Sequence, residues 1–197
     1  MDYTAIYEKY NGELRPLISE FEGREEQFEE PILKSMAYVV DELSLCVQEE
    51  YLDKQKVHFE TAQQNLDEAV TNSYKYLTYS HHKRLKKFKR RFSRRQLELF
   101  DNGKFVGKFS ANSDKAEELT RRAHKHKVLL EAKDDFRQAY GLYSDLEHEI
   151  SKFESEGASL QPRAVSVFLT VVKMVVSVAV AVAVSIAAAY CFSKCSL

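Results

Sequence analysis

The sequence predicts an all-α protein in which a helical cytosolic body, residues 1–160, precedes one transmembrane helix, residues 164–192. Along most of the body, apolar residues recur at spacings of three and four, the period of an amphipathic helix. Neither proline nor glycine, which interrupt helices, occurs from residue 32 to residue 102. A long run rich in Val and Ala follows near the end of the 197-residue chain. These three observations define the predicted fold class.

The predicted transmembrane helix rests on the stretch Met174–Phe192, nineteen consecutive residues without a charge. As a helix it is roughly 28 Å long, about the thickness of the hydrocarbon core of a bilayer. The Val/Ala alternation of residues 178–184 does not indicate a membrane β-strand, because both faces of that strand are apolar. Residues 193–197 form a short tail, and the N-terminus has no apolar run of the kind found in signal peptides. We therefore expect the body to stay in the cytosol.

Two features of this segment favour a homo-oligomer. Small residues recur at every fourth position, at Ser177, Ala181, Ser185 and Ala189. Such rows let membrane helices approach closely, although Val/Ala-rich composition also produces them. Lys173 lies among apolar residues, where a charge costs a few kcal/mol. It either snorkels to the headgroups or lines an oligomeric pore.

The first half of the body predicts two helices. The first spans residues 3–21, with a break or kink at Asn11-Gly12 and Pro16. Pro31 suits the first turn of a second helix, which continues to about residue 102 with a kink near residues 49–53.

A dense basic segment, residues 81–95, lies on the same predicted helix. Nine of the thirteen residues from 83 to 95 are cationic: Lys83, Arg84, Lys86, Lys87, Lys89, Arg90, Arg91, Arg94 and Arg95. Leu85, Phe88 and Phe92 recur at helical spacing, so the segment is amphipathic. Nucleic acid phosphates, anionic lipid headgroups and the acidic first half of the chain all fit it as partners. Residues 1–80 carry 17 acidic and 7 basic side chains, a balance of −10.

Two further elements complete the predicted body. Residues 97–109 read as a small β-hairpin, because Asn102-Gly103 stands between two short apolar runs. A last helix is expected from Asp114, which forms an N-terminal capping pair with Glu117, to about Glu156.

The sequence predicts no metal and no cofactor. It contains no glycine-rich phosphate loop, no Cys/His spacing typical of metal ligands and no nucleophile motif. Its three cysteines, Cys46, Cys191 and Cys195, agree with a reducing compartment.

One motif points to chemistry. Residues 121–126 contain Arg-x4-His, formed by Arg121 and His126 in the first turns of the predicted last helix. This resembles the ribonuclease motif of HEPN domains, all-α proteins in which Arg and His from two copies meet at one interface. Together with the basic segment and the single membrane helix, the chain resembles the HEPN-like accessory membrane proteins of type VI-B CRISPR systems, which act beside an RNA-guided RNase.

The resemblance implies a bacterial inner-membrane protein that assembles into a pore-like oligomer and enhances antiviral defence once viral RNA is recognised. A tail-anchored tethering or scaffold protein and a membrane-bound HEPN ribonuclease remain alternatives. In a ribonuclease, His126 transfers a proton and Arg121 holds a phosphate. The sequence shows no carboxylate near His126 to orient it, since Glu131 is five residues away. We therefore expect Arg121 and His126 to be structural and RNA not to be cleaved.

Overall fold

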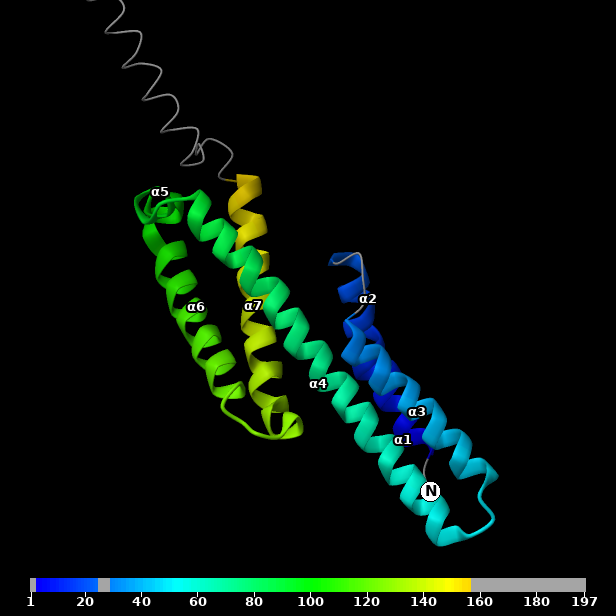
Figure 1. Cartoon of the computed structure of the whole chain (residues 1–197). Helices are drawn as coiled ribbons and strands as arrows, with labels where there is room; N and C mark the ends of the chain where they lie inside the picture. The colour runs from blue at the N-terminus through cyan, green and yellow to red at the C-terminus, as the bar shows by residue number, and fades with distance from the viewer. Residues whose placement is uncertain (1–2, 25–28, 157–197) are drawn as a thin grey trace, which may run out of the picture.

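The computed structural model describes residues 3–24 and 29–156, and within these ranges every regular element is a helix (Figure 1). The predicted all-α class is confirmed for this part of the chain. None of its helices is both long enough and apolar enough to cross a membrane. The predicted transmembrane segment 164–192, with Lys173, Ser177, Ala181 and Ser185, lies outside the described residues, as does the tail.

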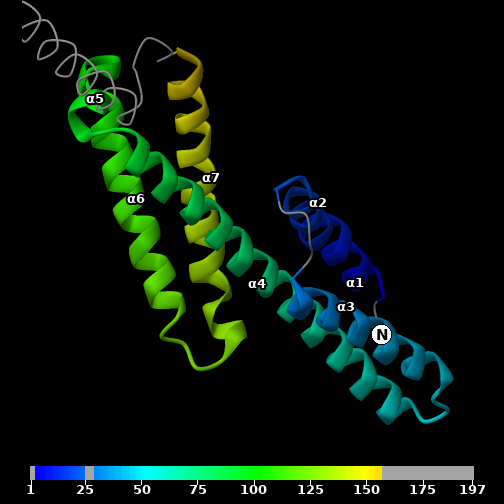
Figure 2. The same ribbon diagram turned by 45° about the horizontal axis from the view of Figure 1, so that its top comes forward.

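A 40-residue helix, α4 (Leu52–Arg91), runs through the whole molecule, and the other helices pack along it (Figures 1 and 2). Helix α3 (Glu30–Gln48) runs antiparallel to its first half. Helices α1 (Tyr3–Lys9) and α2 (Arg15–Arg24) complete this N-terminal lobe. Its core gathers apolar side chains from α2, α3 and α4, among them Leu17, Phe21, Cys46, Phe59, Leu66 and Val70.

The C-terminal lobe packs on the second half of α4. It contains the short α5 (Arg94–Glu98), α6 (Lys104–Ala123) and α7 (Lys133–Glu156), with α6 antiparallel to α7. Its core is a cluster of aromatic rings: Phe88, Phe92, Phe100, Phe105, Phe109 and Phe153. This lobe holds the end of α4 that carries the basic segment.

The predicted β-hairpin at residues 97–109 is wrong. The chain forms α5, a 3-10 turn at Phe100–Gly103, and the start of α6. Gly103 has a φ of 81° and is the N-cap of α6, so its left-handed conformation serves a helix–helix turn. Helical geometry then puts Phe105 and Phe109, four residues apart, on one buried face.

The helix predicted from Pro31 to residue 102 is divided in two. The break falls at residues 49–51, inside the region expected to kink, and there the chain reverses direction. Reversal lets the apolar face of α3 pack on the apolar face of α4, which a single straight helix would leave exposed. The amide of Gln55 donates to the backbone carbonyl of Glu49 at 2.6 Å, which ties the turn to α4.

The helix predicted from Asp114 to Glu156 is also two helices. Asp114 lies inside α6 and not at a cap, and residues 124–128 with the 3-10 turn Leu129–Ala132 separate α6 from α7.

The first predicted helix, residues 3–21, is interrupted less than the sequence predicts. A π-helical turn, Tyr10–Leu14, joins α1 to α2, where the N–H of Arg15 bonds to the carbonyl of Tyr10 and Pro16 follows.

Candidate anion-binding groove

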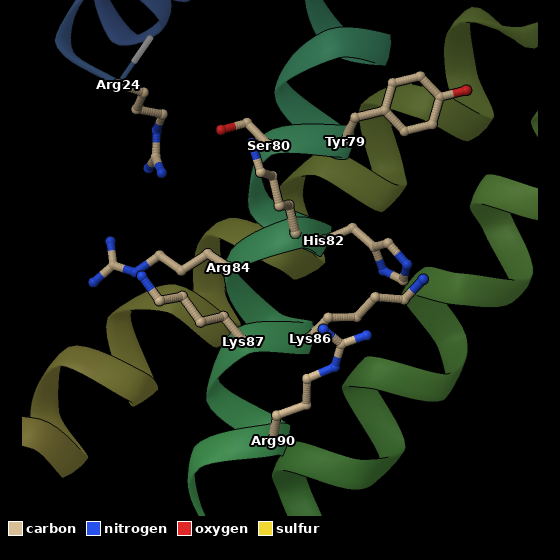
Figure 3. Close-up of a pocket in the computed structure, with 9 residues that line it drawn as sticks. Arg24, Tyr79, Ser80, His82, Arg84, Lys86, Lys87 and Arg90 are labelled. Carbon is tan, nitrogen blue, oxygen red and sulfur yellow. The ribbon is translucent and has the colours of Figure 1, made fainter.

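The basic segment forms the last turns of α4 and its connection to α5. Leu85, Phe88 and Phe92 are buried against the C-terminal lobe, as their spacing predicts. The nine cationic side chains of the segment are exposed. In Figure 3, Arg84 and Lys87 extend to one side of the helix, and Lys86 and Arg90 extend to the other.

These side chains line an open groove of about 690 Å³. Arg24, which approaches from α2, closes one end of it (Figure 3). Its lining residues are Arg24, Tyr79, Ser80, His82, Lys83, Arg84, Lys86, Lys87 and Arg90. Six of these nine are Lys or Arg and none is acidic, so the groove suits an anionic ligand.

Four of the nine predicted cations form ion pairs with carboxylates. The pairs are Arg84–Glu147, Arg84–Glu154, Lys89–Glu117 at 3.3 Å, Arg91–Glu154 at 3.3 Å and Arg94–Glu98 at 3.0 Å. All of these carboxylates belong to α5, α6 and α7. Within the described residues, none of these nine cations forms an ion pair with the acidic first half of the chain, the third partner that its charge suggested; the one contact of the segment with a carboxylate there is that of His81 with Glu20.

Four cations of the groove have no carboxylate partner in the part of the chain that the structure describes. These are Lys83, Lys86, Lys87 and Arg90, named here the groove quartet. Arg95, beyond the groove, also lacks one there. Four like charges on two turns of one helix repel each other, and a bound anion relieves that repulsion.

A buried charge network lies under the groove. His81 on α4 is 2 % exposed, and its Nε2 lies 3.1 Å from a carboxylate oxygen of Glu20 on α2. Its Nδ1 is 2.8 Å from Glu147 on α7, an ion-pair distance without hydrogen-bond geometry. Arg24 pairs with both carboxylates. The network therefore joins three helices.

The carboxylates of this network are held ionised. The hydrogen bond from His81 lowers the pKa of Glu20 to about 2 against the opposing effect of burial, with help from Tyr140 and Arg24. Burial alone would raise the pKa of Glu147, but Arg24, His81 and Arg84 outweigh it and the pKa falls.

A second, smaller depression adjoins the groove at His82, which lines both. Its other lining residues include Arg121, His124 and Tyr143. His82 Nδ1 lies 2.9 Å from the Tyr143 hydroxyl, and His124 Nε2 lies 2.6 Å from the hydroxyl of Tyr79. Burial lowers the pKa of both imidazoles, assisted by Lys86 at His82 and by Lys75 at His124. Two imidazoles with lowered pKa values thus lie near Arg121, and Glu117 also lines this depression, so it is less positive than the groove.

The structure does not bring Arg121 and His126 together within one chain. Arg121 lines the depression with His82 and His124, whereas His126 lines a separate one with Arg122 and Asp135. His126 Nε2 is 3.3 Å from Asp135, and Arg122 Nε donates to the same carboxylate at 2.7 Å. The expectation that no carboxylate lies near His126 is therefore wrong, since the turn between α6 and α7 brings Asp135 back to it.

Comparison of the chain with protein-family models, with curated proteins and with solved structures finds no match.

Proposed function

We propose that this chain is a single-pass membrane protein whose basic end lies against the anionic lipid headgroups of the cytoplasmic leaflet. The groove quartet carries the proposal, because four cations without carboxylate partners among the described residues suit an external anion. Nucleic acid has the same phosphate chemistry. The position of the groove in the molecule favours lipid.

Helix α7 ends at Glu156, at the same end of the molecule as α5 and the last turn of α4 (Figures 1 and 2). Only residues 157–163 separate Glu156 from the predicted transmembrane segment, and seven residues reach at most about 25 Å. Residues 86–109 and 149–156, which form this end, carry ten basic and five acidic side chains. An anchor at residues 164–192 would therefore hold a net positive surface beside the headgroups.

The wider role follows from the resemblance to HEPN-like accessory membrane proteins. On that basis the anchored copies assemble into a pore-like oligomer that perturbs the membrane and enhances RNA-guided antiviral defence. A ribonuclease would need Arg121 and His126 of two copies to meet, because within one chain they line separate depressions. The contacts of His126 and Arg122 with Asp135 connect the turn to α7, which is a structural task.

Charge reversal tests the lipid contact. Replacing all four residues of the groove quartet with Glu is expected to weaken binding of residues 1–160 to vesicles of phosphatidylcholine and phosphatidylglycerol at least about 100-fold. Each basic residue near an anionic surface contributes about 1 kcal/mol. Co-sedimentation measures the binding, and a circular dichroism spectrum establishes that both fragments are helical.

A matched control reverses four exposed lysines elsewhere, Lys34, Lys54, Lys56 and Lys127. It changes the net charge equally, and we expect binding within about fivefold of the original, because distant surface charges are screened by salt. Equal losses in the two variants would show that net charge alone acts and would contradict the groove. Binding to single-stranded RNA without binding to the vesicles would reassign the groove to nucleic acid.

The pore-like assembly predicts a membrane effect in cells. When an RNA-guided RNase recognises its target transcript, cells that contain the chain are expected to depolarise. Replacing Ala181 and Ser185 with Leu is expected to abolish this, because bulky side chains keep membrane helices apart. A potential-sensitive dye measures the response. Unchanged depolarisation in the double variant would exclude the small-residue row as the oligomer contact.

A further inference from the structure

The outer face of α3 carries a regular apolar seam that faces solvent. Its members are Leu33, Ala37, Val40, Ser44 and Val47, which alternate at spacings of four and three. This is the spacing of the a and d positions of a coiled coil. All five are exposed, with Leu33 at 49 %, Val40 at 66 % and Val47 at 75 %. We name them the α3 seam.

The described part of the single chain leaves the seam uncovered. The opposite face of α3, which includes Ile32, Ser35 and Cys46, is buried against the N-terminal lobe. Helix α3 is therefore apolar on two sides, only one of which has a partner within the described residues. A helix at the surface of a monomer normally presents a polar face to water.

The exposed apolar surface around the seam is large. Tyr38 and Leu45 flank it, and Tyr51 and Leu52 continue it past the end of α3, all between 47 % and 71 % exposed. With the aliphatic members of the seam they present on the order of 700 Å², close to the area that each partner contributes to a standard protein interface. Monomers seldom expose so much apolar surface in one region.

We propose that the α3 seam pairs with the α3 seam of a second copy of this chain, in parallel and in register. The parallel direction rests on the proposed membrane anchoring, because copies anchored at the same end point the same way. Each residue of the seam then contacts the same residue of the second copy. The small Ala37 and Ser44 at the a positions let the two helices approach closely.

The charges beside the seam agree with this register. In a parallel pair, a g position faces the e position five residues later in the partner helix. Asp41 of one copy thus faces Met36 of the other, so no like charges meet beside the seam. An antiparallel pair would instead bring the e positions together, so that Asp41 faces either Asp41 or Lys34 of the partner, depending on the register. The charges are thus compatible with the parallel arrangement, and the anchoring decides between the two directions.

Disulfide cross-linking in membranes tests the pairing. The full chain with Cys191→Ser and Cys195→Ser keeps one thiol, Cys46, which is 1 % exposed. In this background Leu33→Cys and Val47→Cys, tested singly, are each expected to form a covalent dimer on mild oxidation. Lys56→Cys, in the same lobe and exposed but outside the seam, is the control. We expect at least about tenfold more dimer from each seam cysteine.

The possible failures are distinguishable. Yields equal to that of Lys56→Cys would overturn the seam and leave the lipid contact of the groove, tested on residues 1–160, unaffected. Cross-linking only in a mixture of the Leu33→Cys and Val47→Cys chains would show antiparallel pairing, which overturns both the register and the shared orientation that anchoring imposes.

A second variant tests the seam without changing the cross-linked position. Val40→Glu is expected to weaken the cross-link at Leu33→Cys at least about tenfold. Val40 is 66 % exposed, so the lobe itself should fold.

Discussion

Replacing Phe153 with alanine is expected to lower the free energy of unfolding by about 4 kcal/mol, within the range for removal of a buried aromatic ring. Phe153 is 1 % exposed and belongs to α7. Its ring lies 5.0 to 5.3 Å, between centroids, from the rings of Phe88, Phe92, Phe100 and Phe105. Phe88 comes from α4, Phe92 and Phe100 come from the chain that connects α4 to α6, and Phe105 comes from the first turn of α6. The cavity that Phe153→Ala leaves would therefore loosen the contact of α7 with every other part of the C-terminal lobe.

Thermal unfolding of residues 1–160 measures the effect. A loss of this size in a body of about 160 residues lowers the midpoint by about 10 °C. Tyr7→Ala is the control, since Tyr7 is also aromatic but 68 % exposed, and it should shift the midpoint by about 1 °C or less. Similar shifts in the two variants would contradict the assignment of the aromatic cluster as the core of the C-terminal lobe.

Replacing Glu147 with glutamine is expected to destabilise the body by about 3 kcal/mol. Removing one partner from a buried ion pair leaves the other charge without compensation. Glu147 is 8 % exposed and faces His81, Arg24 and Arg84 together. His81 has no route to water, whereas the two arginines are partly exposed, so the loss falls at the lower end of the usual range.

Glu154→Gln provides the matched control. Glu154 lies on the same helix and pairs with Arg84 and Arg91, but its side chain is 38 % exposed, so a loss below about 0.5 kcal/mol is expected. Chemical denaturation of both variants measures the difference. Equal losses would mean that the buried network contributes no more than a surface ion pair.

The same network gives the stability a pH dependence of defined sign. The pKa of Glu20 is lowered to about 2, and the pKa of Glu147 is also lowered. A carboxylate with a depressed pKa stabilises the fold above its unfolded pKa, about 4.3, and this contribution disappears as the pH falls toward the folded value. Stability should therefore decrease from about pH 4.5 to pH 2, and less steeply in Glu147→Gln.

Periodicity predicted those parts of the fold in which local pattern and packing agree. The spacing of Leu85, Phe88 and Phe92 predicted which face of α4 is buried, and the intervening Lys and Arg predicted the exposed one. Where the chain turns without glycine or proline, the same spacing predicted one continuous helix in place of two. Residues 49–51 and 124–128 contain neither, and packing in three dimensions sets those turns. His126 and Lys133 interrupt the apolar pattern and were the available signal for the second break.

From the sequence, the site could be predicted only as a cluster of cationic residues and not as a groove. The nine cations were apparent, but their division into paired and free members depends on which face of α4 meets α7. Arg24, which completes the groove, lies about sixty residues earlier in the chain. Asp135 was missed as the partner of His126 because a continuous helix would have separated them by more than two turns. His81 appeared as part of a basic run, although it is buried.

The arrangement of contacts along α4 also sets the order in which the body can fold. Helices α3 and α4 are joined by three residues and α6 and α7 by nine, so each pair closes through contacts near in sequence, which form fast. The ion pair of Arg24 with Glu147 spans 123 residues, and the hydrogen bond of Tyr140 with Glu20 spans 120. During synthesis, α2 leaves the ribosome long before α7 exists. The contacts of Arg24 and Glu20 with α7 can therefore form only after α7 is made, so the buried network around His81 closes last.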